Sequence, residues 1–456
     1  MTYHTLAISQ PNELTFGRVV YPVTTPRGLV IGGGTVYPEL NFTLPPMSIT
    51  PDTREEVLTH YREIISSALE RAAALYQEGV VFEFETLPEM TLDPSLGIEI
   101  VSILNEACEQ YHQSHGIRGE IRLTPNDLRE LGKPLRMRSG KYLDLILTLF
   151  EGGAQAGGNL LSIESTGGKE LSDYAIMNCD ISASLYSLAV LGVRDVKFLW
   201  EHITRIARST GTISGGDTAC GFGNTAMVLA DKRYIPRVFA AIVRILTVVR
   251  TLAAVEAGAQ GPDKDCGYEG PYLKAIAGIP ISMEGRSSAC AHFSPVGNIA
   301  GACCDLWSNE SVSNVRLLSG MAPTVSMEQL IYDTRLYHAA SQLGSRDAYV
   351  RMLVESDVHR DPQALVLAPE HVIDIAGHIV QGKNAVDASV RGALRGLDII
   401  EAHVHDGSLT LDAREEAWIP LIREKLEEVP RDEDEFTDSM LPLLEEQGID
   451  LGEYGL

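Results

Sequence analysis

The sequence is short of basic residues and of the motifs that mark several common functions. It has 37 Lys and Arg against 62 Asp and Glu, which gives a formal net charge of −25. This balance argues against nucleic acid and anionic membranes as partners, because both are bound by basic surfaces. Neither a CxxC nor an HExxH spacing occurs among its 7 cysteines and 12 histidines. The sequence therefore contains neither of these common zinc motifs.

Segments for export or membrane insertion are also missing from the sequence. The first residues, MTYHTLAISQPNELTFGRV, have neither a basic n-region nor an apolar h-region, so we expect no secretion signal. The most apolar stretch, Val238–Val255, is interrupted by Arg244 and Arg250, which argues against a membrane span. An odd number of cysteines without an export signal indicates free thiols in a reducing compartment. We therefore expect a cytoplasmic protein.

Apolar segments of strand length alternate with amphipathic helical segments from Thr53 onward. The chain of 456 residues is long enough for one large barrel with extensions, or for two or three smaller domains. Alternation about eight times over roughly 250 residues is typical of the (β/α)₈ TIM barrel, a fold of the α/β class. The predicted strands are Val80–Glu85, Glu120–Leu123, Asn159–Ile163, Ala183–Leu191, Thr212–Ser214, Leu252–Val255, Ala275–Gly285 and Gly297–Leu306. For Ala183–Leu191 a helix is the alternative.

The two ends of the chain differ from this alternating region. Residues 1–52 are rich in Pro and Gly, and we expect an N-terminal arm, because no GxGxxG spacing follows Gly32–Gly34 to make a phosphate loop. Residues 53–323 are predicted to form the barrel. Residues 324–456 show helical patterns only, which predicts a helical extension packed on the barrel or on a second copy. Within it, residues 412–456 hold 15 acidic and 4 basic residues, indicating either a solvated helical face or an electrostatic docking face.

Three short apolar runs break into glycine-rich polar loops that each carry a possible zinc ligand. The runs are NLLSIESTGGKE with Glu164, GTISGGDTAC with Cys220, and LAAVEAGAQGPDKDCGYE with Cys266. Strands of a parallel barrel end at one face, so ligands far apart in sequence converge there. Two thiolates and one carboxylate leave a fourth tetrahedral position for a substrate, which predicts a catalytic site with one Zn²⁺ per chain. The alternative is that these are buried free cysteines and a loop carboxylate paired with an arginine.

The same loops closely resemble those of a known family, the zinc subunit of methanol:corrinoid methyltransferases. The similarity rests on SIESTGGKE, TISGGDTACGFGNTAM, AVEAGAQGPDKDCGYE, ISMEGRSSACAH and CCDLWSNESV, and extends from the ELTFG region to the final EYGL. It implies a TIM barrel whose zinc lies at the bottom of a funnel at the C-terminal face, held by Glu164, Cys220 and Cys266. It also implies a homodimer that works in a complex with a small cobalamin-carrying corrinoid protein. The residues beside Cys220, Ala219 and Gly221–Gly223, depart from the family's pattern.

The chemistry that this resemblance implies is methyl transfer from methanol to cobalt. Zinc acts as a Lewis acid on the alcohol oxygen, and Co(I) of the partner's corrinoid attacks the methyl group, giving methyl-Co(III) and water. One alternative keeps the zinc and the corrinoid but uses another small methyl donor, and the changes beside Cys220 motivate it. The other alternative is a phosphate-binding TIM-barrel lyase or isomerase, with the glycine-rich loops as anion sites and Lys264 as the base.

Two acidic residues are predicted as donors of the proton that the leaving oxygen requires. They are Asp217, three residues before Cys220, and Glu256, at the end of its predicted strand. Each has an equally good alternative role, in orienting a ligand or in an ion pair at the barrel rim. Cys303–Cys304 and His403–His405 resemble metal motifs, but we assign metal to neither. The cysteines lie in an apolar segment, and no carboxylate or Cys stands near the histidines to complete a site.

Overall fold

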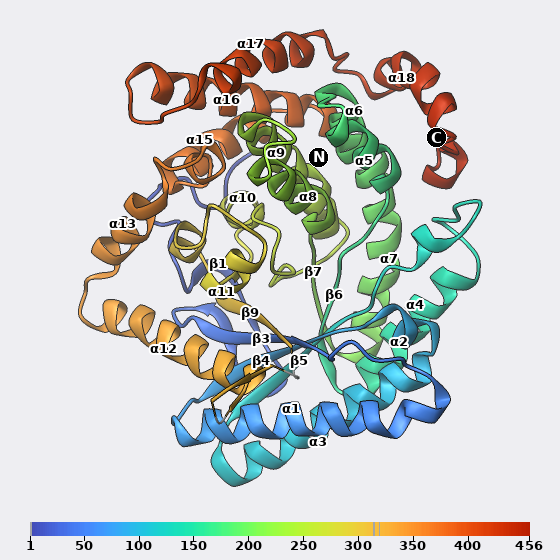
Figure 1. Ribbon diagram of the computed structural model, residues 1–456, viewed down its shortest axis with the longest axis vertical. Coiled ribbons are helices and arrows are strands. Elements are labelled where there is room, and N and C mark those ends of the chain that lie inside the picture. The colour runs from blue at the N-terminus through green and yellow to red at the C-terminus, as the bar shows by residue number, and fades with distance from the viewer. Residues whose placement is uncertain (1, 313–314, 319) are drawn as a thin grey trace.

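A curled parallel sheet forms the centre of the computed structural model, which describes residues 2–312, 315–318 and 320–456 (Figure 1). The sheet has seven strands in the order β7-β6-β5-β4-β3-β9-β8, and each neighbouring pair is parallel. The strands are β3 (Tyr37–Thr43), β4 (Gly79–Glu85), β5 (Arg118–Thr124), β6 (Gly158–Ile163), β7 (Ile213–Asp217), β8 (Ser282–Glu284) and β9 (Leu306–Val312). The predicted TIM-barrel class is confirmed.

An irregular extended segment, residues 259–265, takes the eighth position between β7 and β8. Its backbone donates from Gln260 N to Ser214 O at 2.7 Å and from Gly261 N to Gly215 O at 2.8 Å. On its other side, Ser282 N donates to Asp263 Oδ1 at 2.8 Å. This segment, called the eighth stave below, closes the barrel and leads directly into Cys266.

The barrel interior is polar at the level below the candidate site. Arg122 of β5 is fully buried and donates to Glu39 Oε1 at 2.6 Å and to Ser162 Oγ at 2.8 Å. It also donates to the carbonyl oxygens of Pro262 and Asp263, at 3.1 and 3.0 Å. A buried guanidinium is tolerated when its donors are satisfied. Here those donors link β5 to β3, to β6 and to the eighth stave.

Helices surround the sheet between successive strands. Helix α1, for example, buries Val57, Tyr61, Ile64, Ala68 and Ala72 at spacings of three and four, which lie on one helix face. The long outer helices are α1 (Arg54–Ala74), α3 (Pro94–His115), α4 (Lys141–Gln155), α7 (Val193–Thr210), α9 (Arg237–Glu256) and α12 (Ala322–Gln342). Shorter ones are α2 (Pro88–Leu92), α5 (Lys169–Met177), α6 (Ile181–Tyr186), α8 (Cys220–Asp231), α10 (Gly270–Ala277) and α11 (Arg286–Ala291).

Several predicted strands are wrong. Leu252–Val255 is the last turn of α9, which continues to Glu256 and stops before Gly258 at φ +109°. Ala183–Leu191 lies in α6 and the π-helical turn η3 (Ser187–Gly192), where every residue is buried and the apolar run has no period to distinguish strand from helix. Ala275–Gly285 begins in α10 and contains β8 only at its end. Gly297–Leu306 forms the 3₁₀ turn η4 (Ile299–Ala302) before β9 begins.

The predicted N-terminal arm also needs a correction. Tyr37–Thr43 is not part of an arm but forms β3, which pairs with β4 and β9 inside the barrel sheet. The residues before it include an antiparallel hairpin of β1 (Arg18–Thr24) and β2 (Val30–Gly33). Leu29 and Ile31 of this hairpin join a small apolar cluster with Tyr37 and Leu306, residues at the start of barrel strands. The hairpin therefore closes the N-terminal end of the barrel.

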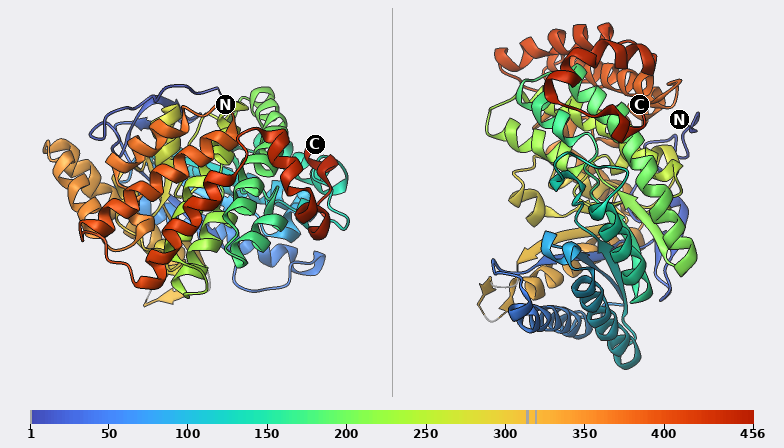
Figure 2. Two further views of the ribbon diagram at one scale, coloured as in Figure 1. Left: turned by 90° about the horizontal axis from the view of Figure 1, so that it is seen from above. Right: turned by 90° about the vertical axis from the view of Figure 1, so that its right-hand side faces the viewer.

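The last third of the chain is helical, as predicted, although α12 belongs to the barrel because it packs against β3 and β9. The helices after it are α13 (Arg346–Asp357), α14 (Pro362–Leu365), α15 (Pro369–Ile379), α16 (Ala385–His405), α17 (Ala413–Glu428) and α18 (Glu433–Gln447). Figure 2 shows α16 to α18 lying across one end of the molecule, with α1 and α3 at the opposite end. Two small strands, β10 (Arg316–Leu317) and β11 (Gly320–Met321), pair beside the start of α12.

Helix α9 is the one helix of the described residues that is long and apolar enough to cross a membrane. Its apolar window has a mean hydropathy of 2.1, but 94% of that window is buried inside the fold. The two charges within it, Arg244 and Arg250, are buried as well. Both arginines point toward the candidate site, which explains why a core helix carries them.

Candidate metal centre

The structure brings together Glu164, Cys220 and Cys266 at the C-terminal ends of β6, β7 and the neighbouring eighth stave. Glu164 follows β6, Cys220 begins α8 just after β7, and Cys266 follows the eighth stave. Their ligand atoms all lie within 4.8 Å of one another, and the Cys266 thiol donates to Glu164 Oε1 at 3.2 Å. Residues more than 100 positions apart in the chain thus lie close together. The predicted strand ends hold for Glu164 and Cys220, whereas Cys266 follows the eighth stave and not the predicted strand Leu252–Val255.

This donor set fits zinc. Zinc takes thiolate sulfur at about 2.3 Å and carboxylate oxygen at about 2.0–2.2 Å, so ligand atoms around one ion lie within roughly 4 Å of each other. Cys266 is held in the left-handed region, at φ +56°, which non-glycine residues occupy only when the surroundings impose it. Such imposed conformations cluster at binding sites, and this one places the Cys266 side chain beside Glu164.

Asn224 of α8 connects the two cysteines. Its side-chain amide donates to Cys220 Sγ at 3.2 Å and to the carbonyl oxygen of Cys266 at 2.9 Å. The amide is itself fixed by Arg244, which donates to Asn224 Oδ1 at 3.0 Å and lies over the ring of Tyr268. Asn224 was not predicted from the sequence, although a residue four positions after Cys220 lies on the same helix face as Cys220.

Asp217 holds the loop that carries Glu164 through hydrogen bonds. Ser165, the neighbour of Glu164, donates to Asp217 through its backbone N–H at 3.1 Å and through its hydroxyl at 2.7 Å. Trp200 Nε1 and the backbone N–H of Thr218 also donate to this carboxylate, at 2.7 and 2.9 Å. Arg250 of α9 lies 3.6 Å from Asp217 Oδ1. These contacts occupy both carboxylate oxygens, which fits a residue that positions the loop.

Glu256, the second predicted proton donor, is not brought to the cluster. It ends α9, where it accepts hydrogen bonds from Thr2 N at 2.6 Å and Thr2 Oγ1 at 3.2 Å. Lys197 Nζ lies 3.4 Å from its other oxygen. The prediction placed Glu256 at a strand end, and the misassigned strand Leu252–Val255 is the reason.

Lys264 lies beside the ligands inside a nest of carboxylates. Its ammonium is 2.6 Å from Asp265 Oδ1 and 3.3 Å from one oxygen each of Glu83, Glu85 and Glu164. Burial by itself lowers the pKa of Lys264, but the surrounding acids outweigh burial and raise it well above its usual value. Burial raises the pKa of Glu164 to about 7, against the opposing effect of Lys264. Burial also raises the pKa of Glu83 well above its usual value. Lys264 alone therefore does not keep all four carboxylates ionised, and a bound cation would compensate the remaining negative charge.

Comparison with known proteins shows the family of this chain. The sequence matches, over residues 1–455, the family described as "Methanol-cobalamin methyltransferase B subunit". It is 37% identical over 443 residues to the methanol–corrinoid protein co-methyltransferase of Methanosarcina barkeri (strain Fusaro / DSM 804), covering 96% of this chain and 95% of that protein. The crystal structure of the methanol:cobalamin methyltransferase complex MtaBC from Methanosarcina barkeri matches with a TM-score of 0.95 at 36% identity. That match covers 100% of this chain and 99% of the chain in that structure.

The chain belongs to the methanol-cobalamin methyltransferase B subunit family. It is therefore a methyltransferase, and the resemblance found in the sequence is confirmed.

Two cavities open at the mouth of the barrel. The smaller, of about 180 Å³, is lined in part by Glu164, Gly221 and Phe222. The larger, of about 460 Å³, is lined by the ends of β3, β4 and β9 and by Leu87 and Pro88 after β4. Glu85 and Asn126 line both cavities, so the two adjoin at the barrel mouth.

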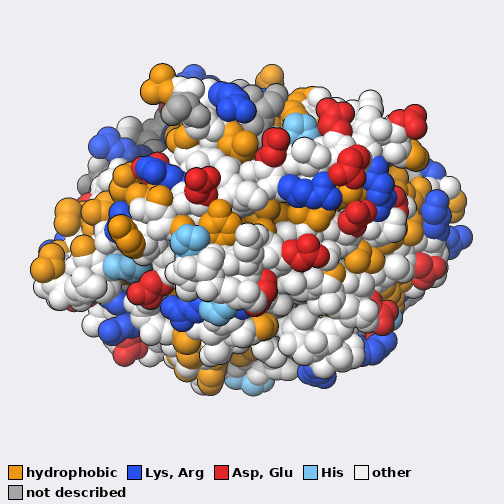
Figure 3. All heavy atoms as spheres, turned by 90° about the horizontal axis from the view of Figure 1, so that it is seen from below, with side chains coloured by type: hydrophobic (Ala, Val, Ile, Leu, Met, Phe, Trp, Pro, Cys, Tyr) orange, Lys and Arg blue, Asp and Glu red, His pale blue; other side chains and the backbone are white. Residues whose placement is uncertain are grey.

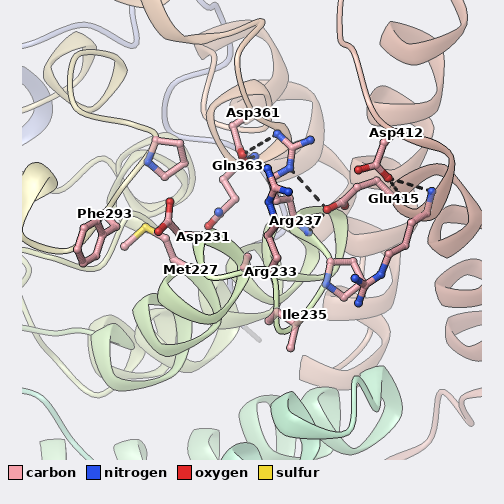
Figure 4. A pocket seen from close by; sticks show the side chains of 14 residues that line it. Met227, Asp231, Arg233, Ile235, Arg237, Phe293, Asp361, Gln363, Asp412 and Glu415 are labelled. Carbon is pink, nitrogen blue, oxygen red and sulfur yellow. Dashed lines mark hydrogen bonds and ion pairs between the residues drawn. The ribbon is translucent and has the colours of Figure 1, made fainter.

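A third cavity, of about 360 Å³, lies beside α8, α9 and α17, away from the predicted ligands (Figure 4). Arg237 crosses it between two acids: Arg237 Nη1 is 3.4 Å from Asp361 Oδ2, and Arg237 N donates to Glu415 Oε1 at 3.0 Å. Because Asp361 also caps α14 by accepting from Gln363 N, this cavity is framed by contacts that hold helices together.

A second group of possible metal ligands was not predicted from the sequence. Glu284 at the end of β8, His292 after α11 and Glu310 of β9 place one ligand atom each within 4.8 Å of the others. His292 Nε2 is 3.4 Å from Glu284 Oε1 and 3.3 Å from Glu310 Oε1. The pKa of His292 is raised to about 9, chiefly by Glu310, and burial raises the pKa of Glu284 to about 8. A protonated His292 therefore already balances the charge of Glu310. The available signal was the position of Glu284 at the end of β8.

Proposed function

We propose that this chain transfers the methyl group of methanol to the cobalt of a corrinoid that a partner protein carries, using one zinc ion held by Glu164, Cys220 and Cys266. The observation that carries the proposal is the convergence of these three ligand atoms within 4.8 Å, at the barrel face where this fold places catalysis. The names of the relatives, a methanol–corrinoid protein co-methyltransferase and a methanol:cobalamin methyltransferase complex, supply the substrates.

In this proposal different residues bind the metal, position its ligands and balance the charge. Zinc bound by the three ligands would act as a Lewis acid that makes the alcohol oxygen a better leaving group. Asn224 fixes the spacing of the two sulfur ligands, and Asp217 fixes the loop of Glu164 through Ser165. Lys264 lies between the neighbouring carboxylates and keeps a positive charge close to Glu164. These contacts preorganise the ligands, so little reorganisation accompanies the reaction.

The two mouth cavities suit a small donor and a large acceptor. The cavity of about 180 Å³ beside Glu164 would receive methanol, and the adjoining one of about 460 Å³ would admit the corrinoid face of the partner. The methyl group of methanol is then transferred to cobalt, and the hydroxyl group of methanol takes up a proton and leaves as water. We expect the chain to work in the cytoplasm as a homodimer within a larger complex with the corrinoid protein.

Metal analysis combined with matched cysteine variants tests this function. The purified protein should contain about one zinc per chain, with X-ray absorption showing zinc–sulfur scattering near ~2.3 Å. Cys220→Ala and Cys266→Ala should lose most of the zinc and the methyl transfer while retaining the folded barrel. Cys303→Ser and Cys304→Ser should keep both, because these thiols are 1% and 0% exposed and contact only the surrounding core. Absence of zinc–sulfur scattering would refute the ligand set.

A second candidate function keeps the metal and the corrinoid but changes the methyl donor. Gly221 and Phe222, which depart from the family's pattern, line the small cavity beside Glu164 and so stand where donor selectivity would be decided. A panel of small alcohols, ethers and methylated amines, each assayed with the same reduced corrinoid protein, separates the two. Faster transfer from another donor than from methanol would favour this second candidate. The lyase alternative loses support because Lys264 is held protonated by its carboxylate neighbours and is therefore a poor base.

A further inference from the structure

Three histidines meet on the surface where α13, α15 and α16 come together, away from the barrel mouth. His371 lies in the first turn of α15, His403 in the last turn of α16, and His359 just after α13. The Nε2 atoms of His371 and His403 face each other at 3.3 Å, with their ring centroids 5.0 Å apart. No metal was predicted at His403–His405, because no carboxylate or Cys stands near them in the sequence; His371, 32 residues away, approaches His403 only in the folded chain.

The hydrogen bonds of His371 fix its tautomer. Its Nδ1 is 2.8 Å from the backbone carbonyl oxygen of Leu365. A carbonyl oxygen only accepts, so the proton of the neutral ring must sit on Nδ1. The Nε2 atom of His371 therefore carries a lone pair, and this lone pair is directed at His403.

The tautomer of His403 follows from Ser408 and Asp406. His403 Nδ1 is 2.6 Å from Ser408 Oγ, and Ser408 Oγ is 2.6 Å from Asp406 Oδ1. The serine has one hydroxyl proton, and the charged carboxylate is the stronger acceptor for it. Ser408 Oγ must then accept from His403 Nδ1–H, which leaves a second lone pair on His403 Nε2. Burial and the neighbouring His371 lower the pKa of His403, which agrees with a neutral ring.

Two lone pairs facing each other at 3.3 Å repel unless a cation lies between them. Zinc binds imidazole nitrogen at about 2.0–2.1 Å, and at a tetrahedral angle two such bonds separate the nitrogens by roughly 3.3 Å. Metal-bound histidines also characteristically donate their other ring N–H to a carbonyl, carboxylate or water, and both of these rings donate theirs. We propose that His371 and His403 form a second, surface binding site for a divalent transition-metal ion such as Zn²⁺.

The surroundings offer further ligands on the same side. The His359 ring centroid is 6.2 Å from that of His403, and its side chain is 44% exposed and therefore able to reorient toward a shared ion. Glu355, Glu370 and Asp406 add negative charge to this corner. His405 does not belong to the group, because residues two apart on a helix point to different faces. An ion here links α15 to α16, and through His359 to α13.

Zinc uptake beyond the barrel site tests the proposal. Protein dialysed to one zinc per chain is titrated with Zn²⁺, and bound zinc is counted by mass spectrometry alongside the melting temperature. The wild type should take up a second equivalent and melt at a higher temperature with it. His371→Gln and His403→Gln should lose both effects. His405→Gln, on the same helix, and His292→Gln, in the group near the barrel mouth, should keep both.

Ser408→Ala provides a milder variant, should either glutamine variant fail to fold. It removes the acceptor of the His403 ring N–H and should weaken binding of the second zinc about 10–100-fold. Zinc uptake that is equal in the wild type and the two histidine variants would overturn the proposal. So would a wild type that takes up no second equivalent, since the two nitrogens would then share a proton. Neither result bears on the barrel zinc, which Cys220→Ala probes separately.

Discussion

At the residue scale, a single amide links the two cysteines that are proposed as zinc ligands. Asn224 donates one side-chain N–H each toward Cys220 Sγ and the Cys266 carbonyl, and Arg244 accounts for its oxygen. No other side chain in the described part of the molecule is recorded as bonding both cysteines in this way. Its contribution therefore concerns the geometry of the ligand pair more than the stability of the fold.

Asn224→Ala should weaken zinc binding without removing a ligand. Residues that orient metal ligands typically contribute about 10–100-fold to metal affinity, and we expect a loss in that range. The measurement is zinc retained during dialysis against a graded series of chelator concentrations. Thr225→Ala is the matched control, because Thr225 is the next residue of α8 and bonds only the Gly221 carbonyl. Equal zinc retention by the two variants would contradict the role given to Asn224.

Asp361 gives a prediction about pH that is independent of the metal. Burial raises its pKa to about 6 in the folded protein, despite Arg237, whereas 3.8 is its usual value. Between these two values the folded protein binds more protons than the unfolded chain, so stability falls as pH rises through this window. Asp361→Asn keeps an amide oxygen to cap Gln363 and removes the buried charge.

The advantage of Asp361→Asn over the wild type should therefore grow with pH. We expect a gain of about 1 kcal/mol between pH 5 and pH 8, since one pKa unit corresponds to roughly 1.4 kcal/mol. Melting temperatures of both proteins at the two pH values, taken at one scan rate, provide the measurement. If the difference between the proteins is the same at both pH values, the buried charge of Asp361 does not destabilise the fold.

At the element scale, α9 and the eighth stave show why part of the barrel was predictable and part was not. Amphipathic helices such as α4 follow from periodicity, and the predicted strand Asn159–Ile163 differs from β6 by one residue at its start. Helix α9 is buried on all sides, so its sequence has no period, and its last turn resembled a strand. The eighth stave lacks an apolar run altogether because its backbone bonds β7 while its side chains form the site.

The candidate site was easier to predict than the elements that carry it. Glu164, Cys220 and Cys266 have side chains whose chemistry is visible in any sequence, and a barrel brings the ends of its strands to one face. Arg244, Arg250 and Asn224 were not predicted, because their roles depend on which helix faces point inward. Glu256 was misplaced for the same reason as the strand before it. Chemical identity is thus local information, whereas support for the ligands depends on packing.

The contact between β7 and the eighth stave should tolerate no side chain at Gly216. A Cβ atom there would lie 2.6 Å from Asp263 Cα, a backbone atom that cannot move aside without shifting the stave that carries Cys266. Gly216→Ala should therefore destabilise the protein by about 1–3 kcal/mol, the usual range for overpacking. We also expect it to lower zinc content. Gly377→Ala in α15 has nothing within 4 Å of the added atom and should stabilise by about 0.5–1 kcal/mol.

Melting temperature and zinc content of the two alanine variants decide this point. Stability of Gly216→Ala equal to the wild type would mean that the eighth stave shifts freely. It would then be a loosely attached loop that only approaches the barrel, and Cys266 would owe its position to Asn224 alone.

At the scale of the whole molecule, both ends of the chain return to the barrel. The hairpin β1–β2 closes the N-terminal end, and the last residues reach the loop that carries Glu164. Tyr454 is buried, accepts from Gly168 N at 3.0 Å and donates to Glu170 Oε1 at 2.7 Å. The acidic segment 412–456 is therefore only partly a solvated face, because its final turn fixes the loop after β6.

Carboxylates gather inside the barrel mouth. The buried Glu83 and Asp265 and the partly exposed Glu85 surround Lys264 there. The lower face of the molecule, by contrast, mixes acidic, basic and apolar side chains without a large area of one charge (Figure 3). A partner that docks at the barrel mouth meets a rigid rim at strand ends and two adjoining cavities, which suits the presentation of a large cofactor.

The reaction should depend on a corrinoid protein, which supplies the methyl acceptor. In the proposal the Cys220 and Cys266 thiols bind the metal, so the methyl acceptor is the cobalt of the partner's corrinoid. Methanol with the zinc-loaded chain alone should give no turnover. Addition of a corrinoid protein reduced to Co(I) should give methyl-Co(III), which is followed by the corrinoid absorption spectrum. Free reduced cobalamin should react more slowly, because it lacks the contacts that orient cobalt toward the methyl group. Methanol consumption without any corrinoid would refute the reaction, and so would indifference to reduced corrinoid across the donor panel by a chain that retains its zinc.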